Sequence, residues 1–423
     1  MKKPKNIFFG WWIVLSAALQ NGLGGSIHWQ GFTVLFIPIS QTFGITSAQT
    51  SMLFALARAE NGLLGPITGW LMDKFGPMPL ALIGTAMAGT GYILLSRTEN
   101  YTQFLLIYVI IVSIGATTSF MQTAFVALNN WFIKKRGLVM SINSAAFRLG
   151  SAILVPTFSY IVYEWGWQNA VLYLGIFLLV FITPLGLFYR RSPESMGLRP
   201  DGDVDEKDLD EKDLDVTTAN NDYYDSGYTW KEAIKTSAFW FLTIATTLRL
   251  SIHGAIFVHM IPILVWKGIS ASTAAWYVGF LALVGVPVIL IMGRLSDKLG
   301  RPKMLAVCYS ASGLSLLLVN ISDNSIYLLL SLLLLVGSEA GSGLNWSLVG
   351  DLFGRKNYGI IRGLLGPFYN AALVVTPVSA GYIYDVTNSY EIVLYTGAII
   401  FFISSISFLY IGNLAKKLKT FQI

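Results

Sequence analysis

The sequence is poor in charged residues. Of its 423 residues, 12% are charged and 54% are hydrophobic, whereas a soluble globular domain carries about 25% charged residues. The apolar residues come in repeated runs of about 18 residues or more, with short charged turns between them. No run has the alternating pattern of an outer-membrane β-strand. This composition indicates an all-α protein whose helices span a membrane.

The sequence is also poor in groups that carry out chemistry. Its single cysteine, Cys308, excludes an intramolecular disulfide and a cysteine-based metal cluster. The three histidines are scattered, and the sequence contains no Walker loop, nucleophile elbow or HExxH motif. We therefore expect no enzymatic activity, no metal and no cofactor.

The first residues have the charge pattern of a signal peptide. Lys2, Lys3 and Lys5 precede an apolar run that begins at Phe8. That run continues beyond Ile37, which is far longer than the apolar region of a signal peptide, and no early small-x-small cleavage site interrupts it. We expect this run to be retained as the first membrane span.

Twelve apolar runs are long enough to cross a bilayer. We place them at 9–38, 47–73, 79–97, 101–130, 134–162, 167–189, 237–266, 271–296, 302–322, 325–352, 358–386 and 389–413. Of the 29 Lys and Arg residues, three lie within spans and only Arg97 and Lys267 fall in the loops on one side. The positive-inside rule then places both termini in the cytoplasm. The net charge of +6 reflects these cytoplasmic loops, so no nucleic-acid partner is expected. We expect a monomer in the lipid bilayer of the cell membrane.

One long loop divides the spans into two sets of six. The predicted domains are an N-terminal six-helix bundle at 1–189, a cytoplasmic acidic linker at 190–236 and a C-terminal six-helix bundle at 237–423. The middle of the linker, DEKDLDEKDLD at 205–215, is a short acidic repeat without aromatic residues. Such a composition predicts disorder, and we interpret the loop as a solubilising linker.

The two halves of the chain repeat each other. GWLMDKFG at 69–76 parallels GRLSDKLG at 293–300, and KKRGLVMSI at 134–142 parallels IIRGLLGPF at 360–368. The offsets, 224 and 226 residues, agree. A six-span unit is therefore duplicated in parallel, which is the arrangement of transporters whose halves rock about a central site.

The first pair of repeats resembles the loop signature of the major facilitator superfamily, G-x-L-x-D-[RK]-x-G-[RK]. The second copy matches in full, whereas Pro77 replaces the final basic residue in the first copy. The resemblance covers nearly the whole chain and implies that the aspartate of each motif latches the two halves together at the cytoplasmic face. A carboxylate there can meet a helix N-terminus or an arginine. The implied gate residues are Gly69, Asp73, Lys74, Arg136, Gly293, Asp297, Lys298, Arg301 and Arg362.

Further stretches are similar to the monocarboxylate and oxalate–formate porters of that superfamily. They are GWWIV at 10–14, WFIKKRGLVMSINSAAFRLGSA at 131–152, SPESMGLRPDG at 192–202 and WKEAIKTSAFWFLT at 230–243. The sequence departs from these porters where they bind substrate. TAAWYVGFLALVGVPVILIMG lacks their Arg and Asp, and GLLGPFYNAALVVTPVSAG lacks the lysine of the oxalate porter. If the chain carries an anion, the cation that binds it must lie elsewhere.

Five full charges lie deep within the predicted spans: Arg58, Glu60, Arg148, Arg249 and Glu339. At roughly 2.5–3.5 kcal/mol each, five unpaired charges would cost on the order of 15 kcal/mol. They must therefore be paired or face a water-filled cavity. Residues two apart on a helix point about 200° away from each other, so Arg58 and Glu60 are poor partners.

These charges predict a binding site for a carboxylate. Arginine binds a carboxylate through two parallel hydrogen bonds, and Arg148 and Arg249 come from different halves. His253 shares a helix face with Arg249 and titrates near neutral pH. The full set of predicted substrate-binding residues is Arg58, Arg148, Arg249, His253, Asn143, Asn345, Tyr369 and Asn370. The predicted proton-coupling residues are Glu60, Glu339 and His253.

Two alternatives stay open. In the first, Arg58, Glu60, Arg148 and Glu339 form structural pairs within each half, and only residues of the seventh span meet substrate. The second concerns function. The leading hypothesis is a proton-coupled secondary transporter of a small organic anion, and the alternative is an efflux carrier for anionic or amphipathic drugs and metabolites.

Overall fold

The computed structural model describes residues 7–202, 227–322 and 324–420, which are almost entirely helical and contain one isolated bridge between Gly227 and Gly354. The acidic repeat predicted at 205–215 lies outside the described residues. Twelve membrane-crossing segments are present within them, as the sequence predicts, and the all-α fold class is confirmed.

The first six crossings are built from short helices as well as long ones. Their elements are α1 (Gly10–Leu19), η1 (Gln20–Gly25), α2 (Ser26–Phe43), α3 (Ser47–Phe75), α4 (Pro77–Leu95), α5 (Tyr101–Leu106), η2 (Ile107–Ser113), α6 (Ile114–Ser119), α7 (Met121–Trp131), α8 (Arg136–Phe177), η3 (Leu178–Ile182) and η4 (Thr183–Phe188). Two short helical turns follow, η5 (Glu194–Met196) and η6 (Pro200–Gly202). The helix α8 contains two crossings, because the backbone reverses at Gly166, where φ is 80°.

The second six crossings are mostly single long helices. They begin after the short helix α10 (Trp230–Ala233) and are α11 (Ser237–Trp266), α12 (Ala271–Leu299), α13 (Arg301–Ile321), α14 (Ser325–Phe353), α15 (Tyr358–Leu364), α16 (Gly366–Thr387) and α17 (Glu391–Thr420). Here α15 and α16 together form one crossing, which is divided at Leu365 immediately before a Gly-Pro pair.

The surface and composition of these helices suit a lipid environment. Nine helices in the described residues are long and apolar enough to cross a membrane. The first two crossings are not among them, and the second of these, α3, carries Arg58 and Glu60. Large apolar side chains cover the outside of the molecule, among them Leu63, Ile83, Ile153, Trp276 and Val378. Apolar residues exposed over so wide an area indicate contact with lipid rather than water.

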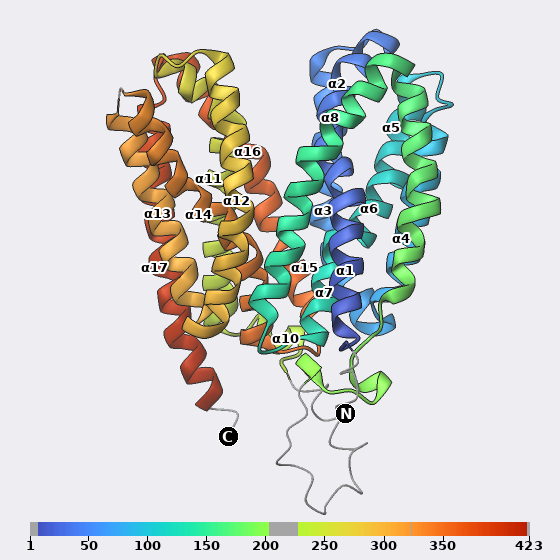
Figure 1. The fold of residues 1–423 in the computed structure, drawn as a ribbon, viewed down its shortest axis with the longest axis vertical. Helices are drawn as coiled ribbons and strands as arrows, with labels where there is room; N and C mark the ends of the chain where they lie inside the picture. Colours follow the sequence, from blue (N-terminus) through green and yellow to red (C-terminus); the bar gives the residue numbers. More distant parts are fainter. Residues whose placement is uncertain (1–6, 203–226, 323, 421–423) are drawn as a thin grey trace, which may run out of the picture.

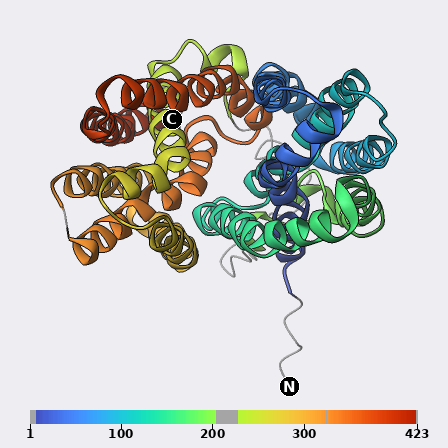
Figure 2. The ribbon, with the colours of Figure 1, turned by 90° about the horizontal axis from the view of Figure 1, so that it is seen from above.

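The helices form two groups that lie side by side (Figures 1 and 2). The elements from α1 to η4 make one group and those from α11 to α17 make the other. Between the groups, α3 packs against α15 and α16, and α8 packs against α12 and α14. The start of α1 and the end of α17 lie at the same end of the molecule (Figure 1). The helices α3 and α12 end there too, and Asp73 and Asp297 lie in their last turns. We call this end the latch end.

Small residues allow the first crossing to approach α8 closely. A Cβ atom added at Gly22 would lie 2.8 Å from the carbonyl oxygen of Ala146, and one added at Gly150 would collide with the carbonyl of Gly22. This contact follows the expectation for glycine-rich membrane helices. The π-helical turn η1 lies at this crossing point, and such turns are frequent at functional sites.

Candidate functional site

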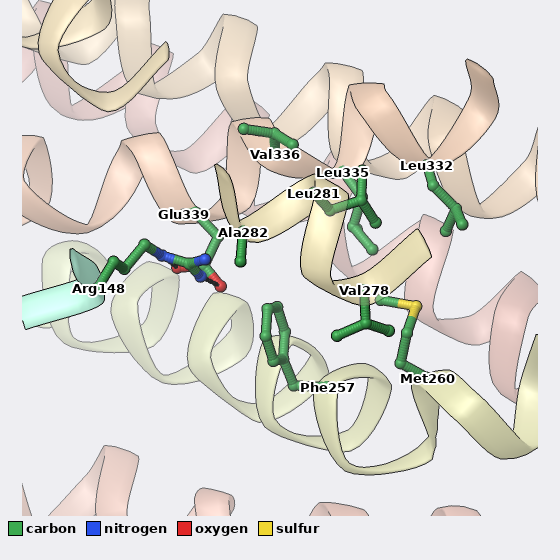
Figure 3. A pocket seen from close by; sticks show the side chains of 10 residues that line it. All are labelled: Arg148, Phe257, Met260, Val278, Leu281, Ala282, Leu332, Leu335, Val336 and Glu339. Carbon is green, nitrogen blue, oxygen red and sulfur yellow. Dashed lines mark hydrogen bonds and ion pairs between the residues drawn. The ribbon is translucent and has the colours of Figure 1, made fainter. Parts of the chain in front are cut away.

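An ion pair joins the two groups of helices near the middle of the membrane-crossing segments. Arg148 on α8 donates from Nε to Oε2 of Glu339 on α14 over 3.0 Å, and its Nη2 contacts Oε1 of the same carboxylate. The side chains are 16% and 13% exposed, and Figure 3 shows them facing each other. The pair therefore crosses between the halves, and it contradicts the alternative in which these two charges pair within each half.

The helix α11 places His253 and Arg249 near this pair. His253 Nε2 lies 3.4 Å from Oε1 of Glu339, and its Nδ1 lies 3.3 Å from the hydroxyl of Ser338. Arg249 is 2% exposed, with Cζ 5.8 Å from the ring centroid of Tyr309 on α13. Its Nε and Nη2 have no hydrogen-bond partner among the described residues. Arg249 thus packs inside its own half, whereas Arg148 lies between the halves.

A small apolar pocket adjoins the ion pair (Figure 3). Its free volume is about 50 Å³. Its described lining consists of Arg148, Phe257, Met260, Val278, Leu281, Ala282, Leu332, Leu335, Val336 and Glu339. Apart from Arg148, this lining comes from α11, α12 and α14 of the second half.

The charges of α3 have separate surroundings, as their spacing predicts. Glu60 Oε2 accepts hydrogen bonds from Ser113 Oγ at 2.5 Å and Thr117 Oγ1 at 3.3 Å. Its Oε1 has no hydrogen-bond partner among the described residues. Arg58 lies over the ring of Trp29, with Cζ 5.5 Å from the centroid. The hydroxyl groups of η2 and α6 therefore satisfy one oxygen of the Glu60 carboxylate.

The predicted polar site residues are divided between interface and interior. Asn370 on α16 donates to Asn61 Oδ1 on α3 over 3.3 Å and so joins the halves, next to Tyr369. Asn345 is fully buried and accepts a hydrogen bond of 3.1 Å from a threonine of α11. Asn143 is also fully buried on α8, and no partner for its side chain is found among the described residues.

Two aspartates join the halves at the latch end through backbone hydrogen bonds. Asp73 at the end of α3 accepts from the N–H groups of Gly359 and Ile360, each over 2.9 Å. Asp297 at the end of α12 accepts from the N–H group of Gly137 over 2.8 Å and from the next residue over 2.9 Å. The acceptor in each case meets the first turn of a helix, α15 or α8, where free N–H groups and the helix dipole favour a negative charge. We call these contacts the Asp73 latch and the Asp297 latch.

A network of charges surrounds the Asp297 latch. Arg301 donates to Asp297 over 2.8 Å and to Asp351 on α14 over 2.5 Å. Arg136 on α8 donates to the other oxygen of Asp351 over 2.7 Å and is 3% exposed. The Arg136–Asp351 bond crosses between the halves, so it adds to the two backbone contacts of Asp297 that hold α8 to the second half here.

The Asp73 latch has a different neighbourhood. The repeat offsets place Pro77 at the position of Arg301 and Phe125 at that of Asp351. Arg362, the counterpart of Arg136, therefore meets aromatic rings, with Cζ 5.0 Å from the centroid of Phe125 and 4.4 Å from that of Trp346. The duplicated gate thus combines an ionic side with a cation–π side.

The glycines of the two motifs permit close backbone contact. A Cβ atom at Gly69 would collide with the carbonyl of Gly359, and one at Gly293 would collide with the side chain of Ser141. The predicted gate lysines do not take part in these contacts. Lys74 is exposed, with Nζ 5.0 Å from the ring centroid of its neighbour Trp70, and Lys298 is exposed as well.

The sequence model of the Major Facilitator Superfamily matches residues 14–289 and 255–421, which together cover nearly the whole chain. The chain belongs to the Major Facilitator Superfamily. It is a multi-pass membrane transporter and not an enzyme.

Several curated superfamily members are similar to this transporter over most of its length. Monocarboxylate transporter 13 of Rattus norvegicus is 22% identical over 92% of this chain and 85% of its own. Monocarboxylate transporter 2 of Rattus norvegicus is 23% identical over 97% of this chain and 84% of its own. The oxalate:formate antiporter of Oxalobacter formigenes is 24% identical over 73% of this chain and 68% of its own.

Solved structures of the superfamily share the fold. The proton:xylose symporter XylE bound to 6-bromo-6-deoxy-D-glucose has a TM-score of 0.71 at 14% identity, covering 97% of this chain and 95% of that one. The human organic anion transporter MFSD10 has a TM-score of 0.66 at 16% identity, covering 95% of this chain and 97% of that one. At these identities the likeness concerns the fold alone.

The segment at 192–202, after the sixth crossing, forms contacts that the sequence analysis did not predict. Glu194 forms a two-point ion pair with Arg355 of the α14–α15 turn, with distances of 2.8 and 2.9 Å. The two side chains are only 7% and 2% exposed. Asp201 accepts from three successive backbone N–H groups at 133–135, over 2.8 to 3.0 Å. The SPESMGLRPDG stretch therefore binds both halves at the latch end.

Asp351 is the other functional residue missing from the sequence prediction. It lies at the end of the tenth crossing and resembles an ordinary terminal acid. The signal that could have found it is positional. Arg136 of the first copy recurs as Arg362 in the second copy, and a buried arginine needs a carboxylate or aromatic rings on a neighbouring helix.

Proposed function

We propose that this chain is a secondary active transporter of a small organic anion, a monocarboxylate, and that it works by alternating access with proton coupling. It acts as a monomer in the cell membrane, with both termini in the cytoplasm. The single observation that carries the proposal is the Arg148–Glu339 ion pair between the halves. The names of the similar monocarboxylate transporters and the oxalate:formate antiporter support the same class of substrate.

The ion pair suggests how anion and proton are coupled. A substrate carboxylate matches the guanidinium of Arg148 in the same two-point geometry that Glu339 uses. Removing one partner of a buried pair leaves an uncompensated charge and costs about 3–5 kcal/mol. Glu339 therefore leaves Arg148 at low cost only when it accepts a proton as the substrate arrives. One anion enters with one proton, and the exchange leaves the site charge unchanged.

Neighbouring residues assist this exchange. His253 lies against Glu339 and Ser338, where it can hold the protonated carboxyl or pass its proton on. Glu60, held by hydroxyl groups, is a second proton-binding candidate in the first half. Arg249 and Arg58 are the further cations that an anion meets as the halves move, while Asn143, Asn345, Tyr369 and Asn370 supply polar contacts.

The positive-inside skew supports a cytoplasmic latch end. In this orientation the Asp73 and Asp297 latches close the cytoplasmic side. The conformation described is then outward-facing, and inward opening requires both latches to part. The gate residues Gly69, Lys74, Gly293, Lys298, Arg301 and Arg362 lie around these contacts.

Uptake into proteoliposomes under an imposed pH gradient tests the proposal. We expect a pH gradient that is acidic outside the liposomes to increase the accumulation of labelled pyruvate, lactate or acetate relative to protein-free liposomes. Arg148→Lys should reduce uptake, because lysine lacks the two-point geometry. Glu339→Gln should retain exchange of anion for anion but lose proton-driven accumulation. Arg97→Gln, at an exposed loop, is the matched control.

Two results would contradict this assignment. If no monocarboxylate is carried while bulky amphipathic anions are extruded, the alternative efflux function holds. If Arg148→Lys and Glu339→Gln both behave like the Arg97→Gln control, the ion pair has no part in coupling.

A further inference from the structure

The apolar pocket beside Arg148 has a shape and lining that discriminate among carboxylates. Among the described residues that line it, only Arg148 and Glu339 are polar, and both lie at one end. Met260, Val278 and Leu332 lie at the opposite end in Figure 3. A ligand in this pocket therefore has one anionic end and an apolar remainder.

We propose that the substrate is a monocarboxylate with an unbranched apolar tail of about three to five carbon atoms, and that this tail occupies the pocket in the second half. This inference rests on the proposed function, in which the carboxylate binds Arg148. The inference further states that the second half receives the tail of the substrate, and it names the residues that limit the length of this tail.

The available space sets the length of the tail. The free volume of the pocket is about 50 Å³, and a water-sized sphere occupies about 10–15 Å³. Three to five groups of that size therefore fit beyond Arg148. Butyrate and valerate match this length. Acetate leaves the far end empty, and octanoate exceeds the pocket.

The lining also excludes a second charge or a strongly hydrated tail. No described residue at the far end donates or accepts a hydrogen bond there, since Met260, Val278 and Leu332 are apolar. A second carboxylate would be buried without a partner, which is strongly unfavourable. Each methylene that enters an apolar site improves binding by about fourfold. The pocket thus favours butyrate over both acetate and succinate.

Isothermal titration calorimetry of the purified full-length transporter tests this preference for tail length. Passive diffusion of the acids does not interfere, because no membrane has to be crossed. The probes are acetate, propionate, butyrate, valerate, octanoate and succinate at pH 6. We expect Kd to fall about fourfold per methylene from acetate to valerate and to stop falling or rise at octanoate. Succinate should bind at least tenfold more weakly than butyrate.

Two variants test the residues that set the length. Leu332→Ala should move the optimum toward longer tails, because it adds room at the far end. Ala282→Leu, beside the carboxylate end in Figure 3, should weaken valerate more than acetate. Leu330→Ala removes the same atoms as Leu332→Ala from the same helix but is 53% exposed on the outside, so the chain-length profile should not move.

The outcomes separate the two proposals. If no carboxylate binds, the proposed function fails, and the inference fails with it. If carboxylates bind with equal Kd at every length, or succinate binds as well as butyrate, the anion-binding function stands and the tail pocket is refuted. A shift of the optimum by Leu330→Ala as large as that by Leu332→Ala would also refute it.

Discussion

The Asp73 latch offers a direct test of how the two halves are held together. Asp73 presents two carboxylate oxygens to two backbone N–H groups at the start of α15. In Asp73→Asn the side chain keeps its shape but has one acceptor oxygen, and its NH₂ group faces the second N–H. We expect this substitution to shift the protein toward conformations in which the latch end is open.

The magnitude follows from the lost contacts. A buried N–H group left without an acceptor costs about 1–3 kcal/mol. Loss of the negative charge at the N-terminus of α15 costs about 1 kcal/mol more. The sum, about 2–4 kcal/mol, corresponds to a change of about 30- to 700-fold in the ratio of closed to open conformations.

Distances between two spin labels measure this ratio. Lys135→Cys and Lys235→Cys place labels on exposed positions of opposite halves at the latch end. Cys308 is 1% exposed and can stay in place, because a buried thiol does not react with the label. In lipid nanodiscs, Asp73→Asn should add a population at longer distance. Asp385→Asn, an exposed acid at the far end of α16, is the control.

The reasoning would be refuted by a folded Asp73→Asn protein whose distance distribution equals that of the control. In that case the two backbone hydrogen bonds would not contribute to closure, and the remaining contacts between the halves would hold the latch end closed.

Three further predictions concern the same end of the molecule. Gly363→Val should also lengthen the label distance, because a Cβ there collides with the carbonyl of Gly65, whereas Gly279→Val, which has open space around it, should not. Arg136→Gln should lower the melting temperature more than Arg362→Gln. The first substitution leaves Asp351 with one partner and costs about 3 kcal/mol of stability, whereas the second removes only cation–π contacts and costs about 1–2 kcal/mol. Equal losses of stability would contradict the assignment of an ionic side and a cation–π side. Glu194→Gln should speed hydrogen exchange of the 192–202 segment relative to the exposed control Glu391→Gln, and unchanged protection would show that the buried pair with Arg355 does not hold this segment.

The fold could be predicted from the sequence because its determinants are local and repeated. Each crossing is a run of apolar residues of bilayer length, and the two motif copies recur at nearly equal offsets. The division of α8 at Gly166 agrees with the sequence prediction, which places one span at 134–162 and the next at 167–189. The π-helical turns could not be predicted, because they depend on contacts between helices rather than on composition.

The site was only partly predictable, because pairing depends on helix rotation and on neighbours far along the chain. Arg148 and Glu339 are 191 residues apart, and no spacing rule connects them. Spacing did predict that Arg58 and Glu60 have separate partners, because a helix fixes the angle between nearby residues. For Arg249 the same information was insufficient. Spacing shows that Arg249 shares a helix face with His253. Only the packing of Arg249 against Tyr309 shows that it lies inside the second half.

The ion pairs between α8 and α14 link the candidate site to the gate. Arg136 pairs with Asp351 at the latch end, and Arg148 pairs with Glu339 toward the middle. Both arginines lie on α8 and both acids on α14, and each pair of like residues is 12 positions apart, which is about 18 Å along a helix.

These two ion pairs act together because α8 and α14 are continuous between them. No proline interrupts either helix over this distance, since the proline of α8 lies beyond Arg148 and α14 contains none. A rotation of α8 that separates Arg148 from Glu339 must therefore also strain the Arg136–Asp351 pair and the Asp297 latch. In the proposed mechanism, an anion that replaces Glu339 at Arg148 removes one of these three restraints and leaves the other two intact. Substrate binding alone thus lowers the barrier to opening without removing it, and the energy of the latch-end contacts sets how much remains.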